Sequence, residues 1–101
     1  MKALKIALNN ISMIEIDSSS IDTELRGLQD AVGGWIETVH LDGEGVMIVD
    51  EEGMLKNYPR NEIASIISRN HIYGVALIVG VEGDKLVDVP KSYLHWMKLY
   101  A

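Results

Sequence analysis

The sequence predicts a single α+β domain with a small, mostly antiparallel sheet, a central β-hairpin and two to three helices. Two strand-like runs, Trp35 to Leu41 and Val46 to Asp50, flank the short turn Asp42-Gly43-Glu44-Gly45, which is the pattern of an antiparallel hairpin. Helix-like segments separate this hairpin from other strand-like runs, and that order disfavours a doubly wound parallel sheet. The 101 residues suffice for one domain, residues 1–101, and not for two.

The first third of the chain predicts two strands and a helix. Lys2 to Leu8 alternates loosely and indicates a strand, and Met13 to Asp17 indicates its continuation or a second one. Ser18-Ser19-Ser20 offers N-cap side chains, and Gly33-Gly34 ends the helix that follows. Its expected buried stripe is Ile21, Leu25, Leu28 and Val32.

A second helix is predicted after the hairpin. Tyr58-Pro59 excludes helix in the preceding loop, because proline disfavours the helical conformation in the residue before it. Asn61 can cap a helix that turns Ile63, Ile66 and Ile67 inward, with Asn70 near its end.

The last third predicts a central strand, a short hairpin and a final helix. Val75 to Val81 is almost wholly apolar, as in a strand buried on both faces, and a turn at Glu82-Gly83-Asp84 leads to Lys85 to Val89. Pro90 can begin a last helix over about residues 90–100. Its aromatic stripe is Tyr93, Trp96, Met97 and Tyr100.

The interior of the domain is expected to draw on all of these elements. The predicted buried set is Ile6, Leu25, Leu28, Ile36, Ile48, Ile66, Ile67, Leu77 and Val79.

Composition excludes several classes of function. The chain has no cysteine, so disulfides, thiol nucleophiles and thiolate metal sites are excluded. The net charge is −6 and the nine basic residues form no cluster, which disfavours binding to a nucleic-acid polymer. No apolar run is long enough to span a membrane. These features favour a cytoplasmic protein.

Four segments resemble a known family. GGWIE at Gly33 to Glu37, VDEEG at Val49 to Gly53, YPRNEIA at Tyr58 to Ala64 and IYGVALIVG at Ile72 to Gly80 are similar, in this order, to domain of unknown function 3846. The resemblance covers about residues 20–89 and leaves out the final helix. It implies a protein of a bacteriophage, plasmid or other mobile element, working inside a bacterial cell. It implies no catalytic residues.

The loop from Asn57 to Asn61 is the predicted ligand-binding segment. Tyr58 can stack on a base, Arg60 can bind a phosphate through two hydrogen bonds, and a helix N-terminus follows at Asn61. The alternative is structural: Pro59 shapes the turn, Asn61 caps the helix and Tyr58 packs on the core. Trp35 is expected in the core or in an interface, where it would complete a ligand site.

Catalytic and metal-binding patterns are weak. The acidic residues at the two ends of the hairpin do not have the spacing of a calcium loop, so no metal or other cofactor is predicted. His40, His71 and His95 are scattered along the chain. A small hydrolase would require His40 to meet an acid such as Glu37 or Asp50 in a cleft.

The leading hypothesis is therefore a non-enzymatic binding protein of a mobile element. In its concrete form it is a counter-defence factor that sequesters a nucleotide-derived immune signal, with Asn57, Tyr58, Arg60, Asn61 and Trp35 as contacts. The alternative is a protein–protein inhibitor or decoy that acts on a host enzyme. The aromatic stripe near the C-terminus has two interpretations: it docks within the chain, or it lies at the interface of a homodimer or larger assembly, which is the state that we predict.

Overall fold

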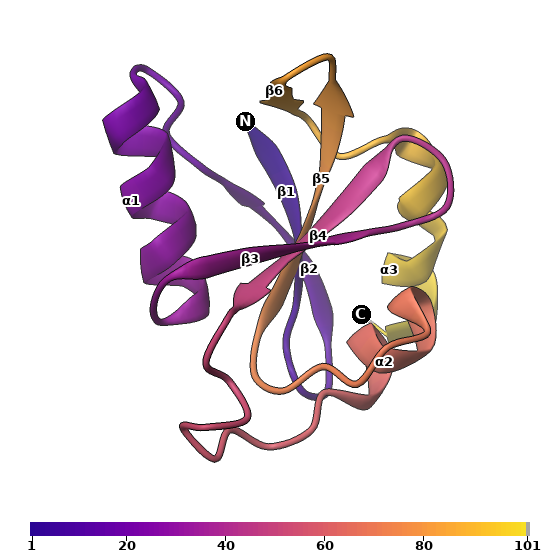
Figure 1. Cartoon of the computed structure of the whole chain (residues 1–101). Helices are drawn as coiled ribbons and strands as arrows, with labels where there is room; N and C mark the ends of the chain where they lie inside the picture. Colours follow the sequence, from indigo (N-terminus) through magenta and orange to yellow (C-terminus); the bar gives the residue numbers. More distant parts are fainter. Residues whose placement is uncertain (101) are drawn as a thin grey trace.

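The computed structural model describes residues 1–100 and shows one antiparallel sheet with helices on both faces (Figure 1). The order of the strands across the sheet is β2-β1-β5-β4-β3, and β6 pairs with β5. This arrangement confirms the predicted α+β fold and its central hairpin. The elements are β1 (Lys2–Ile6), β2 (Ile11–Glu15), α1 (Ile21–Val32), β3 (Ile36–His40), β4 (Gly45–Asp50), α2 (Glu62–Ser68), β5 (Ala76–Glu82), β6 (Lys85–Val87), a 3-10 turn η1 (Lys91–Tyr93) and α3 (His95–Tyr100).

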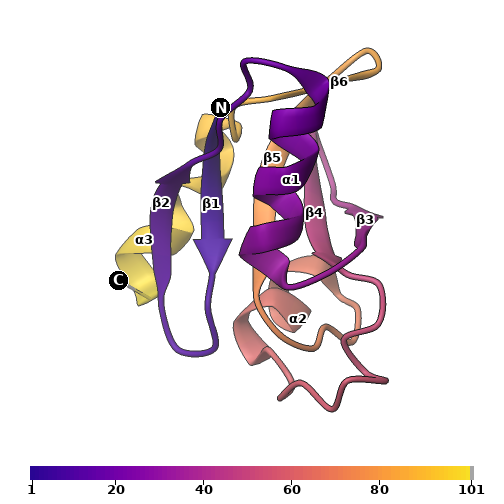
Figure 2. The same ribbon diagram turned by 90° about the vertical axis from the view of Figure 1, so that its left-hand side faces the viewer.

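The two faces of the sheet are covered by different helices. Helix α1 lies over one face, and α2 and α3 lie over the other (Figures 1 and 2). Alternate residues of each strand supply the two cores, as the strand period requires. Under α1 the buried residues are Ala3, Ile16, Leu28, Val32, Val46, Ile48, Leu77 and Val79.

Strand β5 is the centre of the sheet. It pairs with β4 along one edge and with β1 and then β6 along the other. Its residues Ala76 to Val79 are wholly buried, which confirms the expectation drawn from the apolar run. The predicted core residues Ile6, Leu28, Ile48, Leu77 and Val79 are buried, and Ile36 and Ile67 are half-buried.

Helix α1 begins and ends where the sequence predicts, but its buried face is rotated. The Ser20 side chain accepts a hydrogen bond from the Thr23 N–H at 3.1 Å, and Gly33 takes a left-handed conformation with φ 101°. Ile21 and Leu25 are 85% and 39% exposed, so the prediction that they are buried was wrong. The reason is Gly27, where an added Cβ would lie 3.2 Å from Ile16 Cγ2. Through this glycine the helix packs closely on Ile16, the residue that follows β2.

Helix α2 is also rotated relative to the prediction. Ile66 is 58% exposed, so its expected inward position was wrong. The seven-residue helix buries Ile63, Ala64, Ser65 and Ser68 instead. The Ser65 hydroxyl accepts a hydrogen bond from the Ile72 N–H at 3.0 Å, and this bond fixes which side of the helix faces the strand that follows.

The C-terminal aromatic stripe packs within the chain. Tyr93 is buried and donates a hydrogen bond to the Asp42 carbonyl, and Trp96, Met97 and Tyr100 are partly buried against the core under α2 and α3. The stripe therefore packs within its own chain, as the intramolecular interpretation expects, and the homodimer or larger assembly stays a prediction. Within residues 1–100, no helix is both long enough and apolar enough to cross a membrane.

Candidate functional site

The segments that carry the family resemblance come together at one end of the sheet. Residues 59–61 run antiparallel to residues 72–74, with hydrogen bonds from Asn61 N–H to the Ile72 carbonyl at 2.8 Å and from Gly74 N–H to the Pro59 carbonyl at 2.9 Å. The loop after β4 packs against these two segments, since an added Cβ on Gly53 would lie 2.7 Å from the Tyr73 carbonyl oxygen. Motifs that are far apart in the sequence thus form one contiguous structure.

An ion pair between a buried carboxylate and an exposed lysine holds the loop after β4. Asp50 is only 4% exposed, and its Oδ2 lies 2.8 Å from Lys56 Nζ. Lys56 also donates to the Gly33 carbonyl at 3.2 Å, so the pair links the end of α1 to the end of β4. Burial acts to raise the pKa of the Asp50 carboxyl, but hydrogen bonds from Lys56, Glu52 N–H and Tyr58 outweigh it and hold that pKa below its usual value.

Glycines give Lys56 and Tyr58 the room they need. A Cβ on Gly34 would lie 2.5 Å from Lys56 Nζ, and a Cβ on Gly74 would lie 2.5 Å from Tyr58 Cδ2. Gly74 also has a positive φ of 85°, which disfavours any other residue. Tyr58 is therefore half-buried against glycine backbone, which agrees with its structural alternative.

Asn61 is a buried structural residue. It is 0% exposed. Its Nδ2 donates to the Ile6 carbonyl at 3.0 Å and to the Gly74 carbonyl at 2.9 Å, and its Oδ1 accepts from Ala64 N–H at 3.0 Å. The predicted capping role is confirmed, and no part of this side chain is left to contact a ligand.

The other two residues of the predicted loop site are exposed. Asn57 lies in the left-handed region with φ 59°. Arg60 donates from Nε to Glu62 Oε1 at 2.9 Å, and its guanidinium contacts the His71 ring. The helix after Arg60 has seven residues, and Asn61 already accepts from its first turn. The loop therefore offers an anion one engaged guanidinium and no free helix end.

Trp35 lies on the surface. Its exposed fraction is 65%, so the expectation that it belongs to the core was wrong, while an interface role stays a prediction. It lines a shallow groove of about 470 Å³ together with Asp30, Glu52 and Lys56. The two glycines before Trp35 keep the chain close to Lys56 and leave the indole outside.

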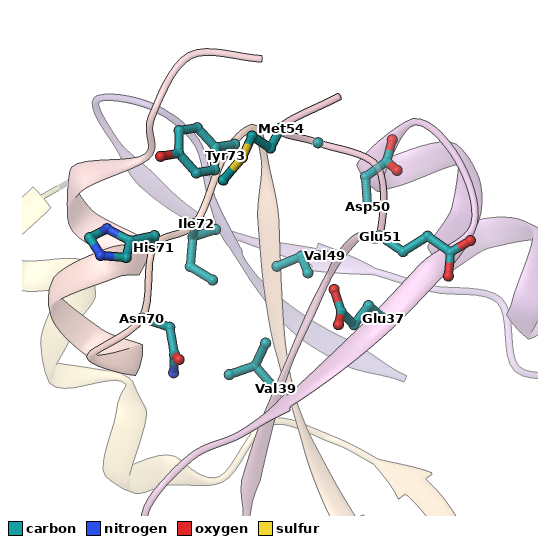
Figure 3. A pocket seen from close by; sticks show the side chains of 11 residues that line it. Glu37, Val39, Val49, Asp50, Glu51, Met54, Asn70, His71, Ile72 and Tyr73 are labelled. Carbon is teal, nitrogen blue, oxygen red and sulfur yellow. The ribbon is translucent and has the colours of Figure 1, made fainter. Parts of the chain in front are cut away.

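A second hollow, the β3–β4 groove, lies on the sheet face that carries α2 and α3 (Figure 3). Its volume is about 280 Å³. Val39, Val49 and Ile72 form an apolar floor, and the Glu37 carboxylate is directed into the groove (Figure 3). The rim is formed by Met54, Tyr73, Asn70, His71 and Glu51.

None of the five predicted contact residues lines the β3–β4 groove. Its residues come from β3, from β4 and the loop after it, and from the segment before β5. These segments meet because β4 lies between β3 and β5. The alternation of β3 does contain a usable signal: Glu37 and Val39 share one face, and Ile36 and Thr38 share the other. That signal predicts which face of β3 lines the groove, but it does not predict that the segment around Ile72 forms the opposite wall.

The histidines do not form an acid–base pair with the groove carboxylates. His40 is exposed at the end of β3 and does not line the groove. The His71 ring points away from Glu37 (Figure 3) and contacts Arg60 instead. In the part of the chain that the structure describes, no three His, Asp or Glu side chains are grouped to hold a metal ion. The contacts that a small hydrolase would require are thus not formed by these side chains.

Comparison with known proteins adds a family and no activity. Searches of curated proteins and of solved structures gave no significant match. The family match includes the first hairpin and the last helix, so the family-like region is longer than the residues 20–89 expected from the motifs. The chain belongs to the family described as domain of unknown function (DUF3846), whose model matches residues 1–100.

Proposed function

We propose that the protein is a non-enzymatic binding protein whose ligand is another protein, recognised through a basic side chain that lies beside an apolar one. The observation that carries this proposal is Glu37, whose carboxylate is directed into a groove with an apolar floor. A lysine or arginine head can pair with Glu37 while its aliphatic stem, or a neighbouring apolar side chain, packs on Val39 and Ile72.

The surface around the groove supports a protein partner. Trp35, Met54 and Leu55 are 65%, 63% and 80% exposed, and all three belong to the segments that meet at this end of the sheet. Tryptophan and methionine are enriched at the centres of interfaces. The net charge of −6 favours the approach of a basic surface.

The family resemblance supplies the setting of the proposal. Domains of this family resemble proteins of phages and plasmids, so the partner that we propose is a bacterial host protein in the cytoplasm, inhibited or diverted by binding. An exposed apolar surface is typical of such inhibitors, and Trp35, Met54 and Leu55 are exposed apolar side chains in the segments that meet at this end of the sheet.

The nucleotide-sequestering form of the hypothesis has less support. Asn61 and much of Tyr58 are used inside the fold, and Arg60 is engaged by Glu62 and His71. Of the predicted contact residues, only Arg60, Asn57 and Trp35 are exposed and accessible to a nucleotide. Near Trp35, the carboxylates of Asp30 and Glu52 disfavour a phosphate.

Site-specific photo-crosslinking in the native bacterial host tests the proposal. A photoreactive residue at Met54, on the groove rim, should give a discrete crosslinked protein. The matched control is Ile66, which is also apolar and 58% exposed but lies on α2 away from the groove lining. Glu37→Lys should abolish the crosslink from Met54, and Glu82→Lys, an equal change of charge at the end of β5, should leave it intact.

Two results would overturn the protein-binding proposal. One is equal crosslinking from Met54 and Ile66, or crosslinking that Glu37→Lys leaves unchanged. The other is calorimetric binding of a cyclic dinucleotide, a cyclic oligonucleotide or an ADP-ribose derivative that is lost in Arg60→Ala and retained in Glu37→Lys. The second result would restore the nucleotide-sequestering hypothesis.

A further inference from the structure

Strand β3 has a free edge. It pairs with β4 on one side, and within residues 1–100 no other strand pairs with it. Figure 2 shows β3 at the outside of the sheet, with no ribbon running beside it. Unpaired edge strands are templates for pairing with another strand.

The ladder with β4 defines which backbone groups are free. Glu51 N–H donates to the Trp35 carbonyl at 2.9 Å, and Leu41 N–H donates to the Gly45 carbonyl at 3.2 Å. Because hydrogen bonding alternates along an antiparallel strand, residues 35, 37, 39 and 41 bond to β4. The N–H and C=O groups of Ile36, Thr38 and His40 therefore point to the open side.

We propose that the occupant of this edge is β3 of a second copy of the chain, paired antiparallel about Thr38. In this register Thr38 faces Thr38 of the second copy, and Ile36 faces its His40. These residues are the ones with free backbone groups, so the seam forms about six hydrogen bonds. The inference goes beyond the proposed function and rests on β3 alone.

The side chains fit this register. Glu37 lies opposite Val39 of the second copy and not opposite another carboxylate, which avoids the like-charge pair that destabilises facing strands. Threonine pairs across strands are favourable. Trp35, 65% exposed in one copy, lies opposite Leu41 of the other and so gains an apolar neighbour.

Pairing about Thr38 also changes the candidate site. Residues that face each other across paired strands project to the same face of the sheet. Glu37 and Val39 of both copies therefore lie on one face, and both β3–β4 grooves open on that surface of the joined sheet. Val39 of the second copy then lies beside Glu37 and adds to the apolar floor. Each groove is completed by its neighbour, and the assembly presents two equivalent sites.

A charge swap at Thr38 tests the seam by sedimentation equilibrium. Thr38 is exposed, so neither Thr38→Lys nor Thr38→Glu removes a core contact. Wild type should be a dimer that dissociates on dilution. Each variant alone should be monomeric, because like charges face each other across the two-fold axis. An equimolar mixture of the two should recover the dimer.

A cysteine crosslink reads out the register. The chain has no cysteine, so Thr38→Cys places one thiol on the proposed axis. Facing Cα atoms in a hydrogen-bonded pair lie about 5.5 Å apart, within the range that a disulfide spans. Mild oxidation should give a covalent dimer, whereas Glu15→Cys, exposed on the opposite edge strand β2, should not.

The proposal fails if wild type stays monomeric at millimolar concentration, or if Thr38→Lys dimerises as wild type does. An oxidised Thr38→Cys chain that stays monomeric would also overturn it. Circular dichroism on each variant establishes that it is folded, so that a monomer is not mistaken for an unfolded chain. None of these results depends on the partner crosslinked from Met54, so failure of the seam and failure of the proposed function are distinguishable.

Discussion

Replacing Asn61 with aspartate separates helix capping from the other two hydrogen bonds of this side chain. Aspartate is as good an N-cap as asparagine, so the bond from Ala64 N–H is kept. The two bonds donated by Nδ2, to the carbonyls of Ile6 and Gly74, are lost. A carboxylate oxygen then faces two carbonyl oxygens in a site that is 0% exposed.

The expected cost follows from these contacts. A buried polar group that loses its partner costs about 1–3 kcal/mol, so two carbonyls together cost about 2–6 kcal/mol. Burial of a charge beside them adds to this figure. A domain of this kind has a total stability of about 5–15 kcal/mol. We therefore expect Asn61→Asp to lower the free energy of unfolding at pH 7 by at least about 3 kcal/mol.

Urea denaturation followed by circular dichroism measures the change. The control is Ser20→Asp at the cap of α1, which keeps an acceptor for Thr23 N–H and removes no buried donor. This control should stay within about 0.5 kcal/mol of wild type. Burial raises the folded-state pKa of the new carboxyl above its unfolded value of about 3.9. The neutral carboxyl can donate one hydrogen bond, so the gap to wild type should shrink as the pH falls toward 3.9.

If the free energy of unfolding of Asn61→Asp at pH 7 is within about 1 kcal/mol of the wild-type value, the reasoning is refuted. Asn61 would then act as a cap alone, and its place among the candidate ligand contacts would have to be restored.

Three further predictions concern stability. Hydrogen bonds lower the pKa of Asp50 in the folded state, so its contribution to the free energy of unfolding is present above the unfolded pKa of about 3.9 and is lost as the pH falls through the folded-state pKa. Asp50→Asn should therefore make the free energy of unfolding, measured by denaturation at pH 2–7, fall less steeply at acid pH. Leu77→Ala at the sheet centre should cost about 2–5 kcal/mol, and an unchanged denaturation midpoint would contradict its burial. Gly74→Ala should cost about 1–3 kcal/mol because its Cβ would strike Tyr58, and adding Tyr58→Leu should recover part of the melting temperature.

Local signals in the sequence were sufficient for both ends of α1 and the start of α2, whereas the last helix, predicted over about residues 90–100, is a 3-10 turn (Lys91–Tyr93) followed by the short α3 (His95–Tyr100). Ser20 and Gly33 mark the two ends of α1, and Asn61 marks the start of α2, because caps act within one turn of a helix. The hairpin follows from a turn of four polar and glycine residues between two apolar runs. These features need no knowledge of distant contacts.

The buried faces of the helices could not be predicted in the same way. Leu25 and Ile66 fit an apolar stripe as well as their neighbours do, but both are exposed. The choice of face depends on Gly27 against Ile16 and on Ser65 bonded to Ile72 N–H. Counting large apolar side chains misses both, since a glycine and a serine fix the packing.

The candidate site shows the same difference between local and distant information. Asn61 and Tyr58 have side chains that suit a ligand and a fold equally well. For Asn61 the structural role is decided by a distant contact, the hydrogen bond to the Ile6 carbonyl, 55 positions away. Glu37 and Ile72 meet in a groove because three strands adopt one particular order, and no spacing in the sequence encodes that order.

The position of β5 at the centre of the sheet has a consequence for synthesis of the chain. β1 is made first, yet one of its two strand partners is β5, near the other end of the chain. Chains leave the ribosome at about 5–20 residues per second, so β1–β2 and β3–β4 wait for seconds as separate hairpins. Neither hairpin has a sheet to join until β5 emerges and pairs with both. Folding of this domain is therefore expected only after β5 (Ala76–Glu82) has left the ribosome, and a chain cut before Ala76 is expected to remain unfolded.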